Sequence, residues 1–313
     1  MKYIGKKIGG LIVMLFLVSF ITFIAFSVIP GDSAITSLGV EATEEAIEAM
    51  RESLGYNDPV VVRYFRWLNG VVHGKFGIST QYKVEVGKLL GEKFPVTISL
   101  AILTILMIAA IGIPLGVWLA KAKNQKLQNF IAFITQMVMS IPSFFLGMVL
   151  TLIFGILLKC FTPGAYVSYK DDFAAFLGYL ILPAVAIALP KISMVAKFTL
   201  SSVKREMELD YVRTAYSKGA VRNYVFRNHI LKNALMPVIT FMGMVIAEVL
   251  AGSIVVEQVF NLPGVGRMLV AAIGYRDLYV VQAIILYIVT VVIVVNCLVD
   301  IIYQLIDPRV HLK

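Results

Sequence analysis

The sequence predicts an all-α membrane protein with six transmembrane helices and a small helical subdomain on the outer side of the membrane. Of its 313 residues, 59% are apolar and only 15% are charged, and the mean hydropathy is +0.86. Soluble domains usually carry about a quarter charged residues. The excess of apolar residues is collected in blocks of about 20 or more, which is the length that an α-helix needs to cross a bilayer.

Six apolar blocks define the expected spans. They cover about 9–29, 96–120, 130–158, 176–196, 234–256 and 279–306. Three lysines precede the first block, as in a signal peptide, but its apolar run of about 19 residues exceeds the usual signal-peptide core and no A-x-A cleavage site follows. A turn at Ile29-Pro30-Gly31-Asp32 ends this block instead. We therefore expect an uncleaved first span.

The basic residues predict the orientation of the spans. Sixteen Lys and Arg residues lie at the two termini, after the second span and after the fourth span, whereas the two short loops on the opposite side hold four. Loops rich in Lys and Arg stay in the cytoplasm. We therefore expect a multi-pass membrane protein with both termini in the cytoplasm. The net charge of +9 is explained by these loops, and no basic stripe interleaved with aromatic residues suggests a nucleic-acid partner.

Prolines and small residues recur within the spans. Backbone groups freed by proline must be satisfied by neighbouring helices in lipid, and glycines permit close helix approach. We therefore expect a packed bundle, with kinks or close contacts at Pro114, Pro142, Pro183, Pro190, Pro237, Gly112, Gly116, Gly243 and Gly252.

The segment 30–95 is the expected outer subdomain. Thr43 is a good N-cap for a helix whose first turn carries Glu44 and Glu45, and Gly55 is a plausible stop. Pro59 favours the first position of a second helix. The remaining expected divisions are 1–29 for the N-terminus and first span, 96–306 for the transmembrane core, and 307–313 for the cytoplasmic tail.

Within the core, the inner stretch 197–233 carries eight basic and three acidic residues. Asp210 to Gly219 is typical of a short helix stopped by glycine. Ala215 and Gly219 lie four residues apart, so that another protein surface could approach them closely. Charge alone would equally fit an ordinary positive-inside loop.

Three ionisable residues fall within or close to the spans, where such residues are functional candidates by default. Glu248 is about midway along the fifth span and is the candidate to line a substrate pathway, with a structural pairing as the alternative. Lys191 and Asp300 are expected near span ends, where long side chains reach the interface.

Sequence patterns for chemistry within this chain are missing. There is no G-x-x-x-x-G-K-[ST] loop to hold ATP phosphates, no H-E-x-x-H and no G-x-S-x-G, and the two cysteines and three histidines are scattered. We expect no catalytic, metal or cofactor site here, so that any energy must come from a partner or from an ion gradient.

Several stretches together carry a family resemblance. Asp210-Tyr-Val-Arg-Thr-Ala-Tyr-Ser-Lys-Gly219 with His229-Ile-Leu-Lys-Asn-Ala-Leu-Met-Pro237 resembles the cytoplasmic coupling loop of ABC importer permeases, with Arg213-Thr214-Ala215 in place of its E-A-A. Further matching stretches are Ile29 to Asp32, Gly74-Lys-Phe-Gly77-Ile-Ser79, Leu262-Pro-Gly-Val-Gly-Arg267, Arg276-Asp277 and Asp307-Pro308-Arg309. Over nearly its whole length the chain is similar to the dipeptide, oligopeptide and nickel permease family, in its first-subunit type with an outer insertion after span one.

The resemblance implies a type I ABC importer permease fold and a heteromeric machine. A homologous second permease would complete the pathway, two cytoplasmic ATPases would bind ATP and Mg, and an extracytoplasmic binding protein would deliver peptides. The coupling residues implied are Asp210, Arg213, Thr214, Ala215, Lys218 and Gly219. Nickel and glutathione remain open as cargo. An ion-coupled secondary transporter and a membrane scaffold without transport are the alternatives from other classes.

Overall fold

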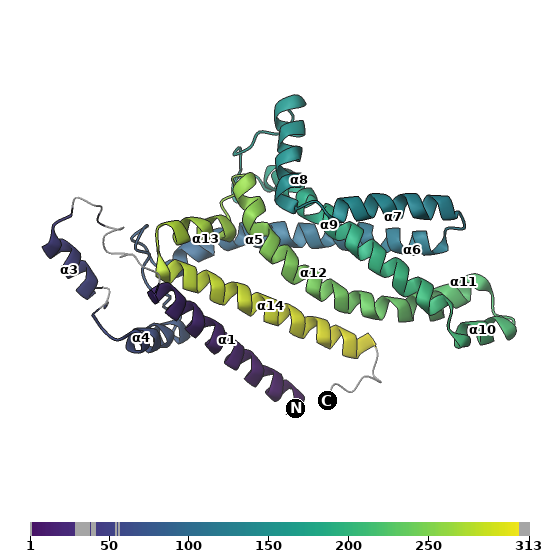
Figure 1. Ribbon diagram of the computed structural model, residues 1–313, viewed down its shortest axis with the longest axis horizontal. Coiled ribbons are helices and arrows are strands. Elements are labelled where there is room, and N and C mark those ends of the chain that lie inside the picture. Colours follow the sequence, from purple (N-terminus) through teal and green to yellow (C-terminus); the bar gives the residue numbers. More distant parts are fainter. Residues whose placement is uncertain (1, 29–37, 39–41, 54, 56, 307–313) are drawn as a thin grey trace. The chain divides into compact units, whose positions relative to one another are not determined.

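The computed structural model describes residues 2–28, 38, 42–53, 55 and 57–306 (Figure 1). These residues are almost entirely helical and form no named strand. The helices are α1 (Lys2–Val28), α3 (Glu44–Ser53), α4 (Val60–Val72), α5 (Val86–Met107), η1 (Ile108–Gly112), α6 (Ile113–Lys121), α7 (Gln125–Met139), α8 (Ser143–Leu150), η2 (Thr151–Leu157), α9 (Phe173–Met207), α10 (Asp210–Ser217), α11 (Arg222–Val225), η3 (Phe226–Ile230), α12 (Leu231–Val259), α13 (Val265–Gly274) and α14 (Leu278–Ile306). The predicted turn at 29–32 and the tail 307–313 lie outside the described residues.

The described chain divides into two compact units. One contains the described residues up to Thr97 together with Pro263–Ile293, and the other contains Ile98–Leu262 with the described residues from Val294 onward. Residues 263–293, which the sequence analysis groups with the transmembrane core, therefore cluster with the outer segment and the first span.

The predicted spans are largely present. Within the described residues, five helices are long and apolar enough to cross a membrane, or six if one bent pair counts as a single span. The second span is longer than predicted, because α5, the π-helical η1 and α6 join into one helix over Val86–Lys121. The fourth is also longer, with Pro183 and Pro190 inside α9.

The third predicted span is not one straight helix. It is divided into Gln125–Met139 and Ser143–Leu157, which meet at 94° (Figure 1). Pro142 explains the break, since it lacks an N–H and disfavours helical geometry at the residue before it. Pro142 itself is extended and begins the second half, so a kink expected at Pro142 is present and divides the third apolar block into two helices.

Close packing around α9 forms the centre of the second unit. This helix contacts α12, α6, η1, α7 and α8. A Cβ added at Gly116 of α6 would lie 2.5 Å from the carbonyl oxygen of Ala196 and 2.6 Å from Cβ of Thr199. Gly112 is similarly close to the α9 backbone, at 3.1 Å from the oxygen of Ile192. The predicted role of these two glycines in close helix approach is therefore confirmed.

In the first unit, Asp277 joins segments that are far apart in the sequence. Its side chain is fully buried and accepts a hydrogen bond of 2.5 Å from Ser79 Oγ and another from the Gln81 N–H. Nearby, Gly77 has φ of +99° and a Cβ there would lie 2.9 Å from the Tyr279 ring, so only glycine fits without rearrangement. The loop after α4 is thus fastened to the start of α14.

The helices of the outer segment begin near their predicted signals. Thr43 Oγ1 accepts a hydrogen bond from the Ala46 N–H at the start of α3, which confirms the N-cap, and Gly55 has φ of +69°. Pro59 precedes α4 by one residue instead of occupying its first position. The buried residues Tyr64 and Trp67 of α4 pack with Phe23 of α1.

Candidate functional site

The helix α10 forms as its local sequence predicts. Asp210 lies in its first turn, where a negative charge is favourable against the helix dipole. At its end, the N–H of Gly219 bonds to the Tyr216 carbonyl, and the N–H of Ala220 bonds to the Ala215 carbonyl. With φ of +82° at Gly219, these bonds make a Schellman stop. The predicted short helix with a glycine stop is therefore present.

A buried apolar cluster fastens α10 to the transmembrane helices. Val212 is 2% exposed and packs with residues of α6, α9, α11, η3 and α12: Ala120, Val203, Val225, Phe226, Ile230 and Ala234. Because this cluster is closely packed, a displacement of α10 acts on α9 and α12 together.

Tyr211 adds a polar link to the same two helices. Its hydroxyl donates to Glu206 Oε1 of α9 at 2.5 Å and accepts from Asn233 Nδ2 of α12 at 3.2 Å. Burial, followed by the hydrogen bond to Glu206, raises the pKa of the Tyr211 phenol to about 12. The phenol is therefore protonated, and able to donate, throughout the physiological pH range.

The outward face of α10 carries most of the predicted coupling residues. Asp210, Arg213, Thr214, Lys218 and Gly219 are exposed, and Arg213 Nη1 lies 3.7 Å from Asp210 Oδ1. A Cβ at Gly219 would meet nothing within 4 Å.

Ala215 differs from the prediction. It is half-buried and packs against the apolar cluster beneath α10, so the expected exposed face of two small residues does not form. The reason is the helical spacing of Val212 and Ala215, three residues apart, which puts both on the buried side. Their spacing could have shown this inward face.

The exposed surface also includes aromatic and apolar side chains that the sequence analysis did not single out. Tyr216 is 40% exposed, Tyr224 58% and Val221 71%. Exposed groups of this kind in one short region are typical of protein interaction surfaces.

The second candidate lies within the spans, where Lys191 of α9 pairs with Glu248 of α12. The alternative of a structural pairing for Glu248 is thus present in the structure. Lys191 was expected near the end of a span, with its side chain reaching the membrane interface. This expectation is wrong, because Lys191 lies near the middle of α9 and Glu248 provides a partner there. Asp300 lies on α14, in a part whose side chains are outside the described set.

A polar notch surrounds this pair. It holds about 350 Å³ and is lined by the break between α7 and α8, by Pro190 and Lys191 of α9, and by Glu248 and Gly252 of α12. The hydroxyl groups of Ser140 and Ser143 come from the break. The side chains of Lys191 and Glu248 remain 24% and 44% exposed, so both charges are accessible from the notch.

Further lysines of α9 reach polar partners on α7. Lys197 Nζ donates to Gln136 Oε1 at 2.7 Å, and Lys204 Nζ donates to Gln128 Oε1 at 2.8 Å. These two contacts between α9 and α7 were not predicted from the sequence. The signal was the spacing of Gln128 and Gln136, eight residues apart in a mostly apolar segment, which places them near one face of a helix.

Comparison with known proteins decides the family. Residues 112–312 match the model of the binding-protein-dependent transport system inner membrane component, and residues 1–101 match the N-terminal part of such membrane components. The chain belongs to this family. It is accordingly the permease subunit of an ABC importer, and the alternatives of a secondary transporter and of a scaffold are excluded.

Relatives match the permease over its full length. A protein of Brucella suis biovar 1 (strain 1330), named provisionally as a peptide transport system permease, is 37% identical over 98% of both chains. The glutathione transport system permease GsiC of Escherichia coli (strain K12) is 33% identical over 100% of both.

A solved structure agrees in fold. A chain of the MetNI methionine ABC transporter, in a crystal form of its inward-facing conformations, has a TM-score of 0.55 at 17% identity and covers 70% of this permease and 96% of that chain. This likeness supports the type I permease fold predicted from the resemblance.

Proposed function

We propose that this permease forms half of a pathway that carries peptides into a prokaryotic cell, with both termini in the cytoplasm. A homologous second permease completes the pathway, an extracytoplasmic binding protein delivers the peptide, and two cytoplasmic ATPases bind ATP and Mg. The names of the full-length relatives, one for peptides and one for glutathione, support a peptide-type substrate. The excess of basic residues on one side of the spans supports the orientation.

The proposal rests on the contacts that attach α10 to the transmembrane helices. Its outward face is open for a docked ATPase, whereas the buried Val212 and the hydroxyl of Tyr211 connect the helix to both α9 and α12. A movement imposed on α10 by ATPase closure is therefore transmitted to two transmembrane helices at once. Asp210, Arg213, Thr214, Lys218 and Gly219 act at the docking face, and Ala215 acts through the cluster.

The notch provides the pathway side of the proposal. A zwitterionic peptide carries a positive amino terminus and a negative carboxyl terminus. Glu248 and Lys191 provide an accessible partner of opposite charge for each terminus. Exchange of this pair for contacts with the peptide termini keeps every charge matched inside the membrane, where unmatched charges are costly.

The test is uptake of labelled peptides of two to five residues, of glutathione and of nickel, in cells with and without this permease. Loss of peptide uptake on deletion is expected. In the complemented strain, Gly219→Trp should abolish uptake while the protein still inserts, because the space beside Gly219 is open within the chain and the bulk meets only a docked partner.

The matched control is Gly219→Ala, since alanine carries the same strain as tryptophan in the left-handed backbone conformation of this position but is much smaller. This variant should keep most of the uptake. Equal loss in both variants would show that the backbone stop matters and not the docking space. Loss of glutathione or nickel uptake alone would change the cargo. Uptake that resists vanadate but collapses with an ionophore would contradict the energy source.

A further inference from the structure

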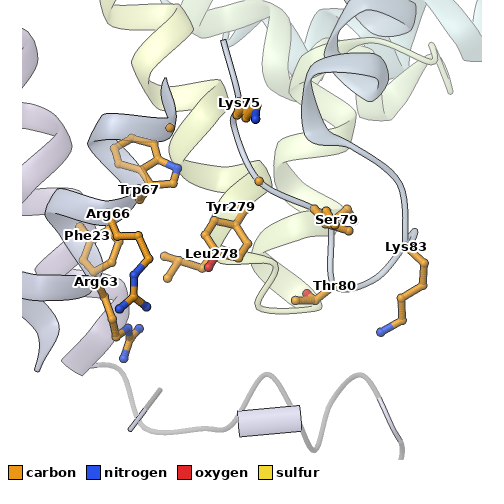
Figure 2. A pocket seen from close by; sticks show the side chains of 13 residues that line it. Phe23, Arg63, Arg66, Trp67, Lys75, Ser79, Thr80, Lys83, Leu278 and Tyr279 are labelled. Carbon is orange, nitrogen blue, oxygen red and sulfur yellow. The ribbon is translucent and has the colours of Figure 1, made fainter. Parts of the chain in front are cut away.

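A second cleft lies in the first unit (Figure 2). It holds about 500 Å³ and is lined by α1, α4, the loop after α4 and the start of α14. Phe23, in the last turns of the first span, and Leu278, at the first residue of the last span, form part of its wall. The cleft is therefore at the level where these two helices leave the bilayer.

The charged residues that line the cleft are basic. Four cationic side chains line it, Arg63, Arg66, Lys75 and Lys83, and none of its described lining residues is acidic. In Figure 2 the Arg66 side chain lies beside Phe23 and that of Arg63 lies below it, whereas Lys75 lies above Tyr279 and Lys83 lies at the opposite edge of the view. Arg66 is paired with the exposed Asp58 at its outer edge. The cleft thus favours a ligand with a negative group.

The buried indole of Trp67 points to the same kind of ligand. Trp67 is 6% exposed and its N–H has no hydrogen-bond acceptor among the described residues. In Figure 2 the indole nitrogen is on the side of the ring that is nearer Tyr279 and the cleft. An oxygen acceptor from a ligand would satisfy this donor, whose burial without a partner is otherwise unfavourable.

Apolar surface continues from the cleft along the outside of this unit. Only 11% of the first span is buried within the chain, and α4, which packs on it, exposes Val61, Val62 and Phe65. Trp and Tyr residues such as Trp67 and Tyr279 are enriched at the level of lipid headgroups. A helix with apolar side chains on its free side and arginines beside them is suited to lie in that interface.

We propose that this cleft binds the headgroup of an anionic phospholipid of the outer leaflet. The phosphate lies among the arginines and lysines, and the acyl chains follow the exposed apolar faces of α1 and α4. A soluble anion would use only the charges, whereas the adjoining apolar surface of the first span fits the chains of a lipid. The lipid thereby fastens α4 and its loop to the first span.

The test is native mass spectrometry of the purified full chain in neutral detergent with added phosphatidylglycerol or phosphatidylcholine. The triple variant Arg66→Gln, Lys75→Gln, Lys83→Gln is compared with a control that removes the same charge elsewhere, Lys88→Gln, Lys123→Gln, Lys126→Gln. Phosphatidylglycerol binding is expected to weaken about tenfold or more in the first variant. The control should stay within about twofold of the wild type.

A second variant guards against a failure of the triple variant to fold. Lys75→Gln alone, which changes one exposed side chain, should weaken phosphatidylglycerol binding about fivefold. The proposal would be overturned if phosphatidylcholine bound as tightly as phosphatidylglycerol, or if the two triple variants retained phosphatidylglycerol equally. Displacement of the lipid by soluble glycerol phosphate would also overturn it. The proposal would also be overturned if the triple variant at Arg66, Lys75 and Lys83 kept its lipid affinity but no longer bound a soluble binding protein, because the cleft would then be a protein contact.

Discussion

In the α10 region, the residues proposed to dock the ATPase are exposed on one helix of eight residues and on the turn after it, and the chain on either side supplies the start and stop of this helix. In the notch, the corresponding groups come from the break between α7 and α8, from α9 and from α12. Lys191 and Glu248 are separated by 57 residues in the sequence. The first site is thus assembled locally, and the second exists only when the helices are packed around α9.

This difference has a functional consequence. Exposed side chains of α10 have few contacts within the chain, so substitutions there should change coupling and leave folding intact. Substitutions around the notch should affect folding and transport together, since the same helix contacts serve both. Substitutions in the two regions can test this separation.

The largest effect is expected at the contact between α6 and α9. Gly116→Leu places a side chain where even a Cβ would lie 2.5 Å from the Ala196 oxygen, so the helices must separate. Overpacking of this kind should destabilise the fold by about 1–3 kcal/mol or more. The melting temperature in detergent and the yield of folded protein should both fall. Gly178→Leu, on the open side of α9, is the control and should leave both nearly unchanged.

The next effect is expected at Glu248. Glu248→Gln leaves the Lys191 charge without its partner in the spans, and peptide uptake should fall about tenfold, equivalent to about 1.4 kcal/mol. The double variant Lys191→Met, Glu248→Gln should recover the melting temperature but not uptake. Recovery of uptake as well would mean that the pair is structural and does not meet the substrate.

A smaller effect is expected on the outward face of α10. Tyr216→Ala removes a 40% exposed ring, and uptake should fall about fivefold, on the order of 1 kcal/mol of lost docking. The melting temperature should not change. Tyr275→Ala, at a tyrosine that is 46% exposed in the other unit, is the control and should keep normal uptake. A large loss of stability in Tyr216→Ala would contradict the local construction of this site.

The smallest effect is expected for Asp210→Asn. The Asp210 carboxylate is 3.7 Å from Arg213 and both side chains are well exposed, and such pairs contribute little. The melting temperature should stay the same, and uptake should fall by no more than about twofold. A shift of several degrees would show that the pair supports α10 more than its exposure indicates.

Much of this fold is predictable because its signals are local. The length of the apolar blocks predicts the spans, Asp210 and Gly219 mark the short helix between them, and Thr43 marks the start of α3. The inward position of Ala215 also follows from its spacing of three residues from Val212, but this spacing is informative only once Val212 is known to be buried. A kink at Pro142 was expected, but its angle of 94° was not, because a proline within a span can kink, break or simply end a helix.

Taken alone, the sequence determined that this chain is a helical membrane protein, how its loops are charged, and where α10 begins and stops. These properties depend on hydrophobic length and on hydrogen bonds within a few residues. Only the tertiary structure decided that Lys191 meets Glu248, and that Ser79 bonds to Asp277 across 198 residues. Such contacts depend on how whole helices pack, and close approach at Gly116 fixes part of that packing by shape, which no local pattern specifies.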